Sequence, residues 1–251
     1  ESLPLSSISC SEVIERGYRG QRSGRGVCVG LPTVGVSIKI IKVTDQAIAS
    51  WDEVELIEVA LPSEQSITPK NTADHIGEIV VYGPSTTQSY IAHPKGNTLS
   101  KIKGAPPGIQ AIDSQDFSHR MGDLGYFDED GFLWICGRKS HRIDTEVDGQ
   151  LQRWLPHCIE GPLNQIEGIF RTALVRSDRG PIICVELNPN QSVPHILNTL
   201  KAQIKAHSSM KGIYGVIQHP SFPVDTRHNA KIKRKIIAQW VSTRLNQVDP
   251  L

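Results

Sequence analysis

The sequence has 251 residues, of which 38% are hydrophobic and 21% charged, and its formal net charge is +1. This composition is typical of a folded globular protein and excludes a chain that is disordered throughout. The small net charge gives no overall electrostatic attraction to nucleic acids or membranes. No apolar run is long enough to span a bilayer, and the first residues lack the basic-then-apolar pattern of a signal peptide.

The cysteines and histidines do not form a recognisable bonding or metal pattern. The five cysteines are scattered, without a Cys-x-x-Cys pair, so we expect neither a disulfide framework nor a zinc site, and a reducing, cytoplasmic setting. Cys136 and Cys184 lie in apolar runs and are expected to be buried thiols. The nine histidines show no ligand spacing on one helix, which argues against a metal hydrolase.

The first part of the chain is predicted to be mostly β. Gly24–Ile41 combines glycines at turns with an apolar alternation, which predicts strands bent around close-packed glycines. Gly77–Pro84 predicts a buried strand that ends at a Gly-Pro breaker. Residues 63–74 are predicted to be a loop, and Leu99–Ser118 a turn-rich linker.

The most informative stretch is His119–Ile143. It predicts two strands joined by a turn that ends at Asp130-Gly131, with a carboxylate (Asp123) and a guanidinium (Arg138) near its two ends. A carboxylate can accept both hydroxyls of a ribose, and a guanidinium can hold a phosphate with its planar fork. The pairing of Asp123 with Arg138 therefore predicts a nucleotide site.

The second part of the chain is predicted to be a compact domain of mixed helices and strands, after a boundary at Gly137–Arg142. The expected elements are a hairpin (Ile143–Val147 and Leu151–Leu155), a short helix (Pro156–Ile166), a strand pair (Phe170–Val175 and Ile182–Leu187), a helix that starts at Ser192, a strand (Ile213–Gln218) and an amphipathic helix (Ile232–Leu245). The last helix is expected to place five side chains on one side, namely Ile236, Ile237, Trp240, Val241 and Leu245. The predicted fold class is therefore α+β.

A basic cluster near the C-terminus is open to two interpretations. Arg227, Lys231, Lys233, Arg234 and Lys235 lie close together at the predicted start of the last helix. Such a cluster is usually a solvated face and occasionally contacts nucleic acid. Its second interpretation, as the surroundings of a catalytic lysine, depends on a resemblance to a known family.

The chain resembles the acyl-adenylate-forming superfamily of acyl-CoA synthetases, adenylation domains and luciferases. The ribose-binding and hinge motifs of that family appear in order as Arg120-Met121-Gly122-Asp123, Gly125-Tyr126, Asp130-Gly131 and Gly137-Arg138, with Met121 in place of a threonine. Lys231 falls on the family's catalytic lysine, with Ala230 in place of the preceding glycine. The ordered set is much more specific than any one of its pieces, and the resemblance covers nearly the whole chain.

The resemblance implies a domain organisation and a set of roles. Residues 1–138 would be the C-terminal portion of a large AMP-binding domain, β-rich and distorted barrel-like, and residues 139–251 a small mobile α+β domain that swings on Ser140. ATP and Mg²⁺ would be the cofactors. Asp123 and Arg138 would bind the nucleotide, while the Lys231 ammonium would offset charge that builds as the acyl-phosphate bond forms. Glu1 is either a magnesium ligand or an ordinary terminal residue.

Within the superfamily, the residues at these motif positions resemble those of the olefin β-lactone synthetase branch. That branch adenylates a β-hydroxy fatty acid, whose hydroxyl then closes a lactone and releases AMP. The alternative is a fatty acyl-CoA ligase. Such ligases usually carry Lys-x-x-Gly after the hinge, whereas Ile143–Gly149 lacks this motif and is acidic, which would disfavour the phosphates of CoA. We therefore expect lactone closure rather than thioester formation.

The family's phosphate loop and acyl pocket are not found in these residues. The chain therefore resembles the C-terminal part of a larger cytoplasmic enzyme, whose missing N-terminal portion would be its partner, and we expect no turnover from the chain alone. An interpretation of another class is a binding module that uses residues 227–235 to hold RNA or an acidic partner. Aromatic residues make up only 6% of the chain and form no stacking array beside this cluster, which argues against it.

Overall fold

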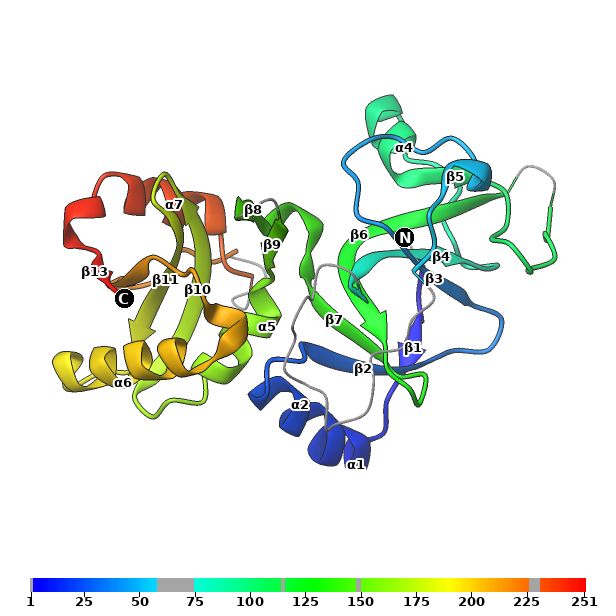
Figure 1. Cartoon of the computed structure of the whole chain (residues 1–251). Coiled ribbons are helices and arrows are strands. Elements are labelled where there is room, and N and C mark those ends of the chain that lie inside the picture. Colours follow the sequence, from blue (N-terminus) through cyan, green and yellow to red (C-terminus); the bar gives the residue numbers. More distant parts are fainter. Residues whose placement is uncertain (1, 58–74, 114–115, 148–149, 226–230) are drawn as a thin grey trace. The chain divides into compact units, whose positions relative to one another are not determined.

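A computed structural model describes residues 2–57, 75–113, 116–147, 150–225 and 231–251 (Figure 1). The chain folds into two compact units, which we describe separately. Of the described residues, the first unit contains 2–19, 26–57, 75–113 and 116–140, and the second contains 20–25, 141–147, 150–225 and 231–251. Residues 20–25 thus belong to the second unit, although the sequence placed them in the first.

The first unit is built on a seven-stranded antiparallel sheet in the order β1-β2-β7-β6-β4-β3, with β5 paired to β6. The strands are β1 (Ser6–Ser7), β2 (Val27–Pro32), β3 (Ser37–Ile41), β4 (Gly77–Tyr82), β5 (Lys101–Lys103), β6 (Phe117–Phe127) and β7 (Leu133–Arg138). Every residue of β4 is buried, as its continuous apolar run predicted. Ile79 and Val81 pack in one apolar cluster and Val80 in another, as the two-residue period of a strand requires.

Short helices in the first unit were not predicted, because side-chain caps rather than periodic apolar residues define them. Helix α1 (Cys10–Glu12) begins with a capping box between Ser9 and Glu12, continues as a π-helical turn (Val13–Gly17) and leads into α2 (Tyr18–Arg22). Helix α4 (Pro94–Ser100) starts where the His93 ring accepts a hydrogen bond from the Gly96 amide, at 2.8 Å. The predicted linker Leu99–Ser118 therefore contains the end of a helix, the whole of β5 and the first two residues of β6.

The second unit is a sheet covered by helices on both faces. Its four strands are β10 (Ile169–Ser177), β11 (Gly180–Leu187), β12 (Gly215–Gln218) and β13 (Asp249–Pro250), in that order, with β11 and β12 parallel. The remaining elements are a hairpin of β8 (Ile143–Val147) and β9 (Gln150–Trp154) and the helices α5 (Pro156–Leu163), α6 (Val193–Ala206) and α7 (Arg234–Ser242). The α+β fold class and the predicted order of elements are confirmed.

Alternate residues of the central strands bury opposite faces of this sheet. On one face, Ile183 and Val185 pack with apolar residues of α5 and α6. On the other, Ile182 and Cys184 pack with α7 (Figure 1). Cys136 and Cys184 are both buried, as predicted. Within the part of the chain that the structure describes, no helix has both the length and the apolar character needed to cross a membrane.

Helix α7 corrects the prediction for the last amphipathic helix. It begins at Arg234 rather than Ile232, because Ile232 forms an antiparallel bridge with Val224. Ile237 and Val241, one helical turn apart, are fully buried. Ile236 was expected on the same face but is 48% exposed, since a neighbouring position points about 100° away on a helix.

Candidate active site

Asp123 and Arg138 face each other across the β6–β7 hairpin. They are register partners, and the Arg138 Nε lies 3.2 Å from one Asp123 carboxylate oxygen and the Nη1 3.3 Å from the other. The same Nη1 donates to the Met121 carbonyl at 3.1 Å. The Arg138 side chain is 55% exposed and that of Asp123 25%. The structure thus brings the two predicted nucleotide-binding groups together at a surface that solvent reaches.

A one-residue register shift in the hairpin decides this pairing. Leu124 pairs with Gly137, but Gly125 pairs with Ile135, so Cys136 is the extra residue of a bulge. Without the bulge, the cross-strand partner of Asp123 would be Gly137 rather than Arg138. Gly122 has a φ of +68°, a left-handed conformation that favours glycine directly before Asp123.

The turn of the hairpin is fixed by a buried carboxylate. Asp128 accepts hydrogen bonds from the Phe132 amide at 2.9 Å, the Asp130 amide at 3.2 Å and the Trp134 indole at 2.9 Å. Gly131 completes the turn with a φ of +81°. These contacts fix the conformation of the turn, and the turn sets the register in which β6 and β7 pair.

A buried ionic network anchors the residue that follows Arg138. The Lys139 ammonium lies 2.9 Å from a Glu78 oxygen, and the Arg120 guanidinium donates to that oxygen at 2.7 Å. The side chains of Glu78 and Arg120 are each 1% exposed. Arg120 also donates to the carbonyls of Thr44 and Gln46, each at 2.7 Å. This ionic network was not predicted from the sequence. Its signal was a pair of opposite charges, Glu78 and Arg120, each within a strand-like apolar run.

Ser140, the predicted hinge, is an exposed residue of a 3₁₀ turn (Lys139–His141). It is the last residue of the first unit, and His141 begins the second. Glu1, the possible magnesium ligand, lies outside the described residues. Among the residues that the structure does describe, no cluster of three or more His, Cys, Asp or Glu side chains could hold a metal ion.

Lys231 lies in the second unit, on a short ribbon that we call the lysine ribbon: Pro223–Asp225 paired with Lys231–Lys233. The Asp225 amide donates to the Lys231 carbonyl at 3.0 Å, and the Lys233 amide donates to the Pro223 carbonyl at 2.8 Å. The Lys231 side chain is exposed. It lines a pocket of about 330 Å³ whose other walls are His141, Asp225 and Ile232–Ile236.

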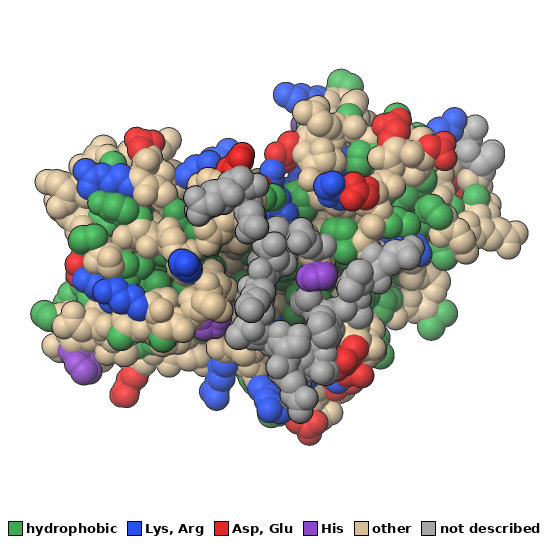
Figure 2. Space-filling view, viewed as in Figure 1, with side chains coloured by type: hydrophobic (Ala, Val, Ile, Leu, Met, Phe, Trp, Pro, Cys, Tyr) green, Lys and Arg blue, Asp and Glu red, His purple; other side chains and the backbone are tan. Residues whose placement is uncertain are grey.

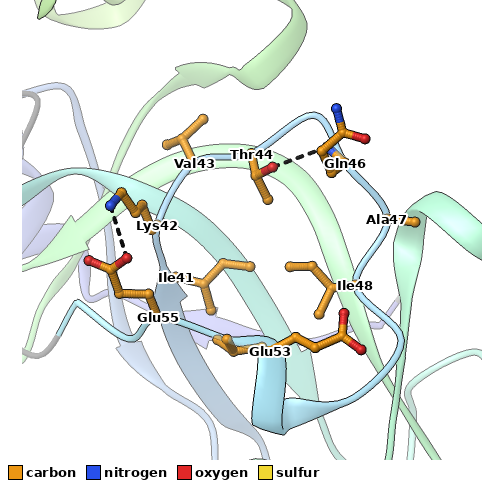
Figure 3. Close-up of a pocket in the computed structure, with 10 residues that line it drawn as sticks. Ile41, Lys42, Val43, Thr44, Gln46, Ala47, Ile48, Glu53 and Glu55 are labelled. Atoms are coloured by element: carbon orange, nitrogen blue, oxygen red, sulfur yellow. Dashed lines mark hydrogen bonds and ion pairs between the residues drawn. The ribbon is translucent and has the colours of Figure 1, made fainter.

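Another pocket, of about 380 Å³, lies in the first unit between residues 41–48 and 53–55 (Figure 3). Ile41 and Ile48 point towards each other across it, and the exposed Lys42–Glu55 ion pair lies at its edge. Neither Asp123 nor Arg138 lines this pocket. Three of its lining residues, Ile41, Ile48 and Val54, belong to one hydrophobic cluster, so we assign the pocket to packing rather than to chemistry.

In the β8–β9 hairpin, the negative charge of Asp144 is compensated by two arginines, which the sequence did not suggest. The Asp144 carboxylate accepts from Arg153 at 2.7 and 2.9 Å and from Arg142 at 2.9 Å. Burial alone would raise the pKa of Asp144, but the hydrogen bonds and charges of the two arginines outweigh it, and the pKa lies below its usual value. Because this negative charge is compensated, repulsion of CoA phosphates by Asp144 is a weak reason to exclude a thioester product.

Comparison with known proteins identifies the relatives of this chain. No family model matches the sequence. The chain is 35% identical over 98% of its length to the olefin beta-lactone synthetase of Stenotrophomonas maltophilia, and 33% identical over 96% to that of Xanthomonas campestris pv. campestris. It spans 42% and 41% of these two relatives, about two fifths of their length.

The fold agrees with the sequence relationship. The O-succinylbenzoate coenzyme A synthetase of Bacillus subtilis, solved with AMP, matches 92% of this chain with a TM-score of 0.58 and 19% sequence identity, and the match covers 37% of that protein. At this identity the match concerns the fold alone. The sequence matches along almost the whole chain lead to one conclusion: the chain belongs to the acyl-adenylate-forming superfamily.

Proposed function

We propose that this chain is part of an ATP-dependent ligase that converts a β-hydroxy fatty acid into an acyl-adenylate and then into a β-lactone. The observation that carries the proposal is the similarity to two olefin beta-lactone synthetases along almost the whole chain, as described above. The Asp123–Arg138 pair supplies a physical basis, because it offers the two groups that a nucleoside monophosphate needs at one place.

In the proposed reaction, the Asp123 carboxylate accepts hydrogen bonds from the ribose hydroxyls and the Arg138 guanidinium binds phosphate oxygen. The two groups hold each other in position before the nucleotide arrives. Their partial exposure lets the nucleotide replace part of their mutual contact at a small desolvation cost. The bulge at Cys136 and the anchored Lys139 fix the backbone on which both depend.

Lys231 would act in the first chemical step. The acid's carboxylate oxygen attacks the α-phosphorus of ATP, the bond to the β-phosphate breaks, and pyrophosphate leaves. The Lys231 ammonium would offset the negative charge that gathers on the carboxylate and the α-phosphate. Delivery of this ammonium requires residues 139–251 to act as a mobile domain with its hinge at Ser140, which is part of the proposal.

The second step closes the ring. The β-hydroxyl oxygen attacks the acyl carbonyl carbon, the hydroxyl loses its proton, and AMP leaves with the electrons of the acyl–phosphate bond. Mg²⁺ would screen the phosphates of ATP. Its proposed ligand on this chain, Glu1, lies outside the described residues.

The non-enzymatic alternative, a module that binds RNA or an acidic partner, receives no support from the comparisons. On the face shown in Figure 2, the described lysine and arginine side chains are dispersed among acidic, apolar and other residues rather than gathered in one patch. A sequence-independent nucleic-acid site usually requires such a patch.

The test is to incubate the complete enzyme with ATP and a β-hydroxy fatty acid, with and without CoA, and to identify the products by mass spectrometry. The proposal predicts AMP, pyrophosphate and a β-lactone whose amount does not depend on CoA. A CoA-dependent thioester without lactone would show that the second step is thioester formation rather than ring closure. Absence of acyl-AMP, lactone and thioester with fatty acids of several chain lengths would contradict the proposed function.

A further inference from the structure

The strand of the lysine ribbon that carries Lys231 leads into a largely buried ion pair. Arg234, directly after the ribbon, directs both guanidinium nitrogens at the two carboxylate oxygens of Glu160 on α5, with Nη2 2.7 Å from Oε2 and Nη1 in contact with Oε1. The side chains are 12% and 8% exposed. Arg234 Nη1 also donates to the Leu174 carbonyl at 3.2 Å, while Glu160 accepts from the Leu174 amide at 2.7 Å. The pair therefore fastens the ribbon to both a helix and a strand.

The partner strand of the ribbon is held by a second carboxylate at the same end, because Pro223 pairs with Lys233. The amide of Phe222, directly before the ribbon, donates to Glu186 Oε2 at 2.9 Å. Arg171 donates to the same oxygen at 2.7 Å and, through Nη2, to the Phe222 carbonyl at 3.4 Å. The Phe222 ring is 3% exposed and meets the His219 ring edge-to-face, with centroids 5.3 Å apart. Backbone and side chain of Phe222 are thus both fixed.

Stability alone does not explain the use of charges at these two places. Bringing a carboxylate and a guanidinium out of water costs free energy that their attraction only partly offsets, and apolar replacements of buried ion pairs are often as stable. Charged, two-pronged contacts do however impose direction, because a fork binds a carboxylate in one geometry. The arrangement fixes the path of the chain on both sides of Lys231.

We propose that Glu160 and Glu186 are positioning residues for Lys231. By holding Arg234 and Phe222, they fix both strands of the lysine ribbon at the end where the ribbon joins the unit, and so determine where the Lys231 ammonium can reach. The inference rests on the proposed function, in which Lys231 acts during adenylate formation. It goes further by assigning the accuracy of that delivery to two buried carboxylates that touch neither substrate nor nucleotide.

The test is a double-mutant cycle in the complete enzyme, read out as ATP–pyrophosphate exchange with a β-hydroxy fatty acid. Arg234→Lys keeps the positive charge but loses the fork. We expect it to lower the exchange rate by about tenfold to 100-fold, as for a small displacement of a reacting group. In the Lys231→Ala background, the same change should lower the remaining rate by less than about twofold, because the group that it positions is gone.

Two further variants complete the design. Glu186→Gln acts on the other strand of the ribbon and leaves the Arg234–Glu160 pair intact, so it tests the proposal even if Arg234→Lys does not fold. It should show the same loss of effect in the Lys231→Ala background. Asp249→Asn is the matched control, because it breaks another ion pair of this unit, Lys201–Asp249 at 2.6 Å, and should change the rate by less than about twofold.

The outcomes separate the two proposals. If Lys231→Ala lowers exchange strongly and the positioning variants lose their effect in its presence, the inference holds. If Lys231→Ala lowers exchange but Arg234→Lys and Glu186→Gln are harmless, or are equally harmful with and without Lys231, the inference is overturned and the proposed function stands. If Lys231→Ala alone has no effect, the role given to Lys231 and the inference that rests on it are both overturned, whereas absence of exchange by the natural enzyme would contradict the proposed function.

Discussion

The two regions that carry the candidate chemistry hold their cations in opposite ways. Arg138, in the first unit, forms its ion pair with Asp123 at the surface and is more than half exposed. The ribbon that carries Lys231, in the second unit, ends at contacts with two buried carboxylates, Glu160 and Glu186. An exposed pair exchanges partners readily, whereas a buried pair fixes geometry. The difference suits the proposed roles, in which Arg138 receives a nucleotide and Lys231 is delivered to it.

The first unit also contains a buried anchor, but this anchor lies one residue beyond the exposed pair. Glu78 holds Lys139, and through Arg120 it holds the backbone at Thr44 and Gln46. Both units therefore place a buried carboxylate near the candidate cation, Arg138 or Lys231, and the carboxylate pairs with a neighbouring residue rather than with that cation. The contrast between exposed and anchored groups can be tested by removing each kind of contact in turn.

The largest effect is expected from Glu78→Gln. It leaves the buried guanidinium of Arg120 without its carboxylate, which should lower the free energy of unfolding by about 3–5 kcal/mol in urea denaturation. The matched control is Glu55→Gln, whose partner Lys42 is 67% exposed, and its effect should stay below about 1 kcal/mol. Equal effects of the two substitutions would show that burial does not distinguish these contacts.

A pH effect should follow from His119 in β6, which is 2% exposed. Burial, together with the charge of Lys101, lowers the pKa of His119 to about 4. The unfolded chain has a histidine pKa of about 6.5 and takes up the proton first as the pH falls. The folded state should therefore keep its full stability above pH 6.5 and lose about 3 kcal/mol between pH 6.5 and 4.

The contribution of His119 is measured by difference, because burial also lowers the pKa values of His207 and His219. Urea denaturation of the natural protein and of His119→Gln is compared over this pH range. The variant should show a shallower fall in stability with acid. Parallel curves would contradict the assignment to His119.

A smaller effect is expected where the backbone presents Asp123. Gly122→Ala meets no neighbouring atom within 4 Å but forces alanine into a left-handed conformation, at a cost of about 1–2 kcal/mol in unfolding free energy. Gly104→Ala is the matched control, with a φ of +88° and equally open space. Both should lose similar stability, and only Gly122→Ala should weaken AMP binding. Equal AMP affinities would show that Gly122 does not position Asp123.

The smallest effect on stability is expected for Arg138→Ala, because its ion pair is exposed. The free energy of unfolding should change by less than about 1 kcal/mol. The affinity of the complete enzyme for AMP, measured by calorimetry, should nevertheless fall roughly tenfold, since one charge-assisted contact to the phosphate is lost. The AMP affinity of Arg138→Lys should lie between those of the natural enzyme and of Arg138→Ala. A strongly destabilised Arg138→Ala protein with normal AMP affinity would show that Arg138 serves stability rather than nucleotide binding, which contradicts the account.

The sequence predicted those features that are set by neighbouring residues. The hairpin around Asp130-Gly131, the helix after Pro156 and the strand pair around Asp178-Arg179-Gly180 follow local patterns, and all three are confirmed. The short helices α1 and α4 were missed, because single capping side chains define them.

Features that depend on distant contacts were not predictable from local pattern. The bulge at Cys136 decides which residue faces Asp123, yet nothing in the sequence of β7 distinguishes Cys136 from its neighbours. Glu160 and Glu186 look like ordinary polar positions of a helix and a strand, because their partners Arg234 and Phe222 lie 74 and 36 residues further along the chain. The pairing of Asp144 was not predicted for the same reason, since Arg153 reaches Asp144 only in the folded hairpin.

The most direct measurement is the rate of ATP–pyrophosphate exchange by the complete enzyme with Lys231→Ala, beside the exposed lysine variant Lys205→Ala on α6. A catalytic ammonium predicts a loss of roughly 10²–10³-fold for Lys231→Ala, as for removal of one transition-state donor, and a change of less than about twofold for Lys205→Ala. A decrease of only a few-fold for Lys231→Ala, similar to that of the control, would contradict the role given to this residue.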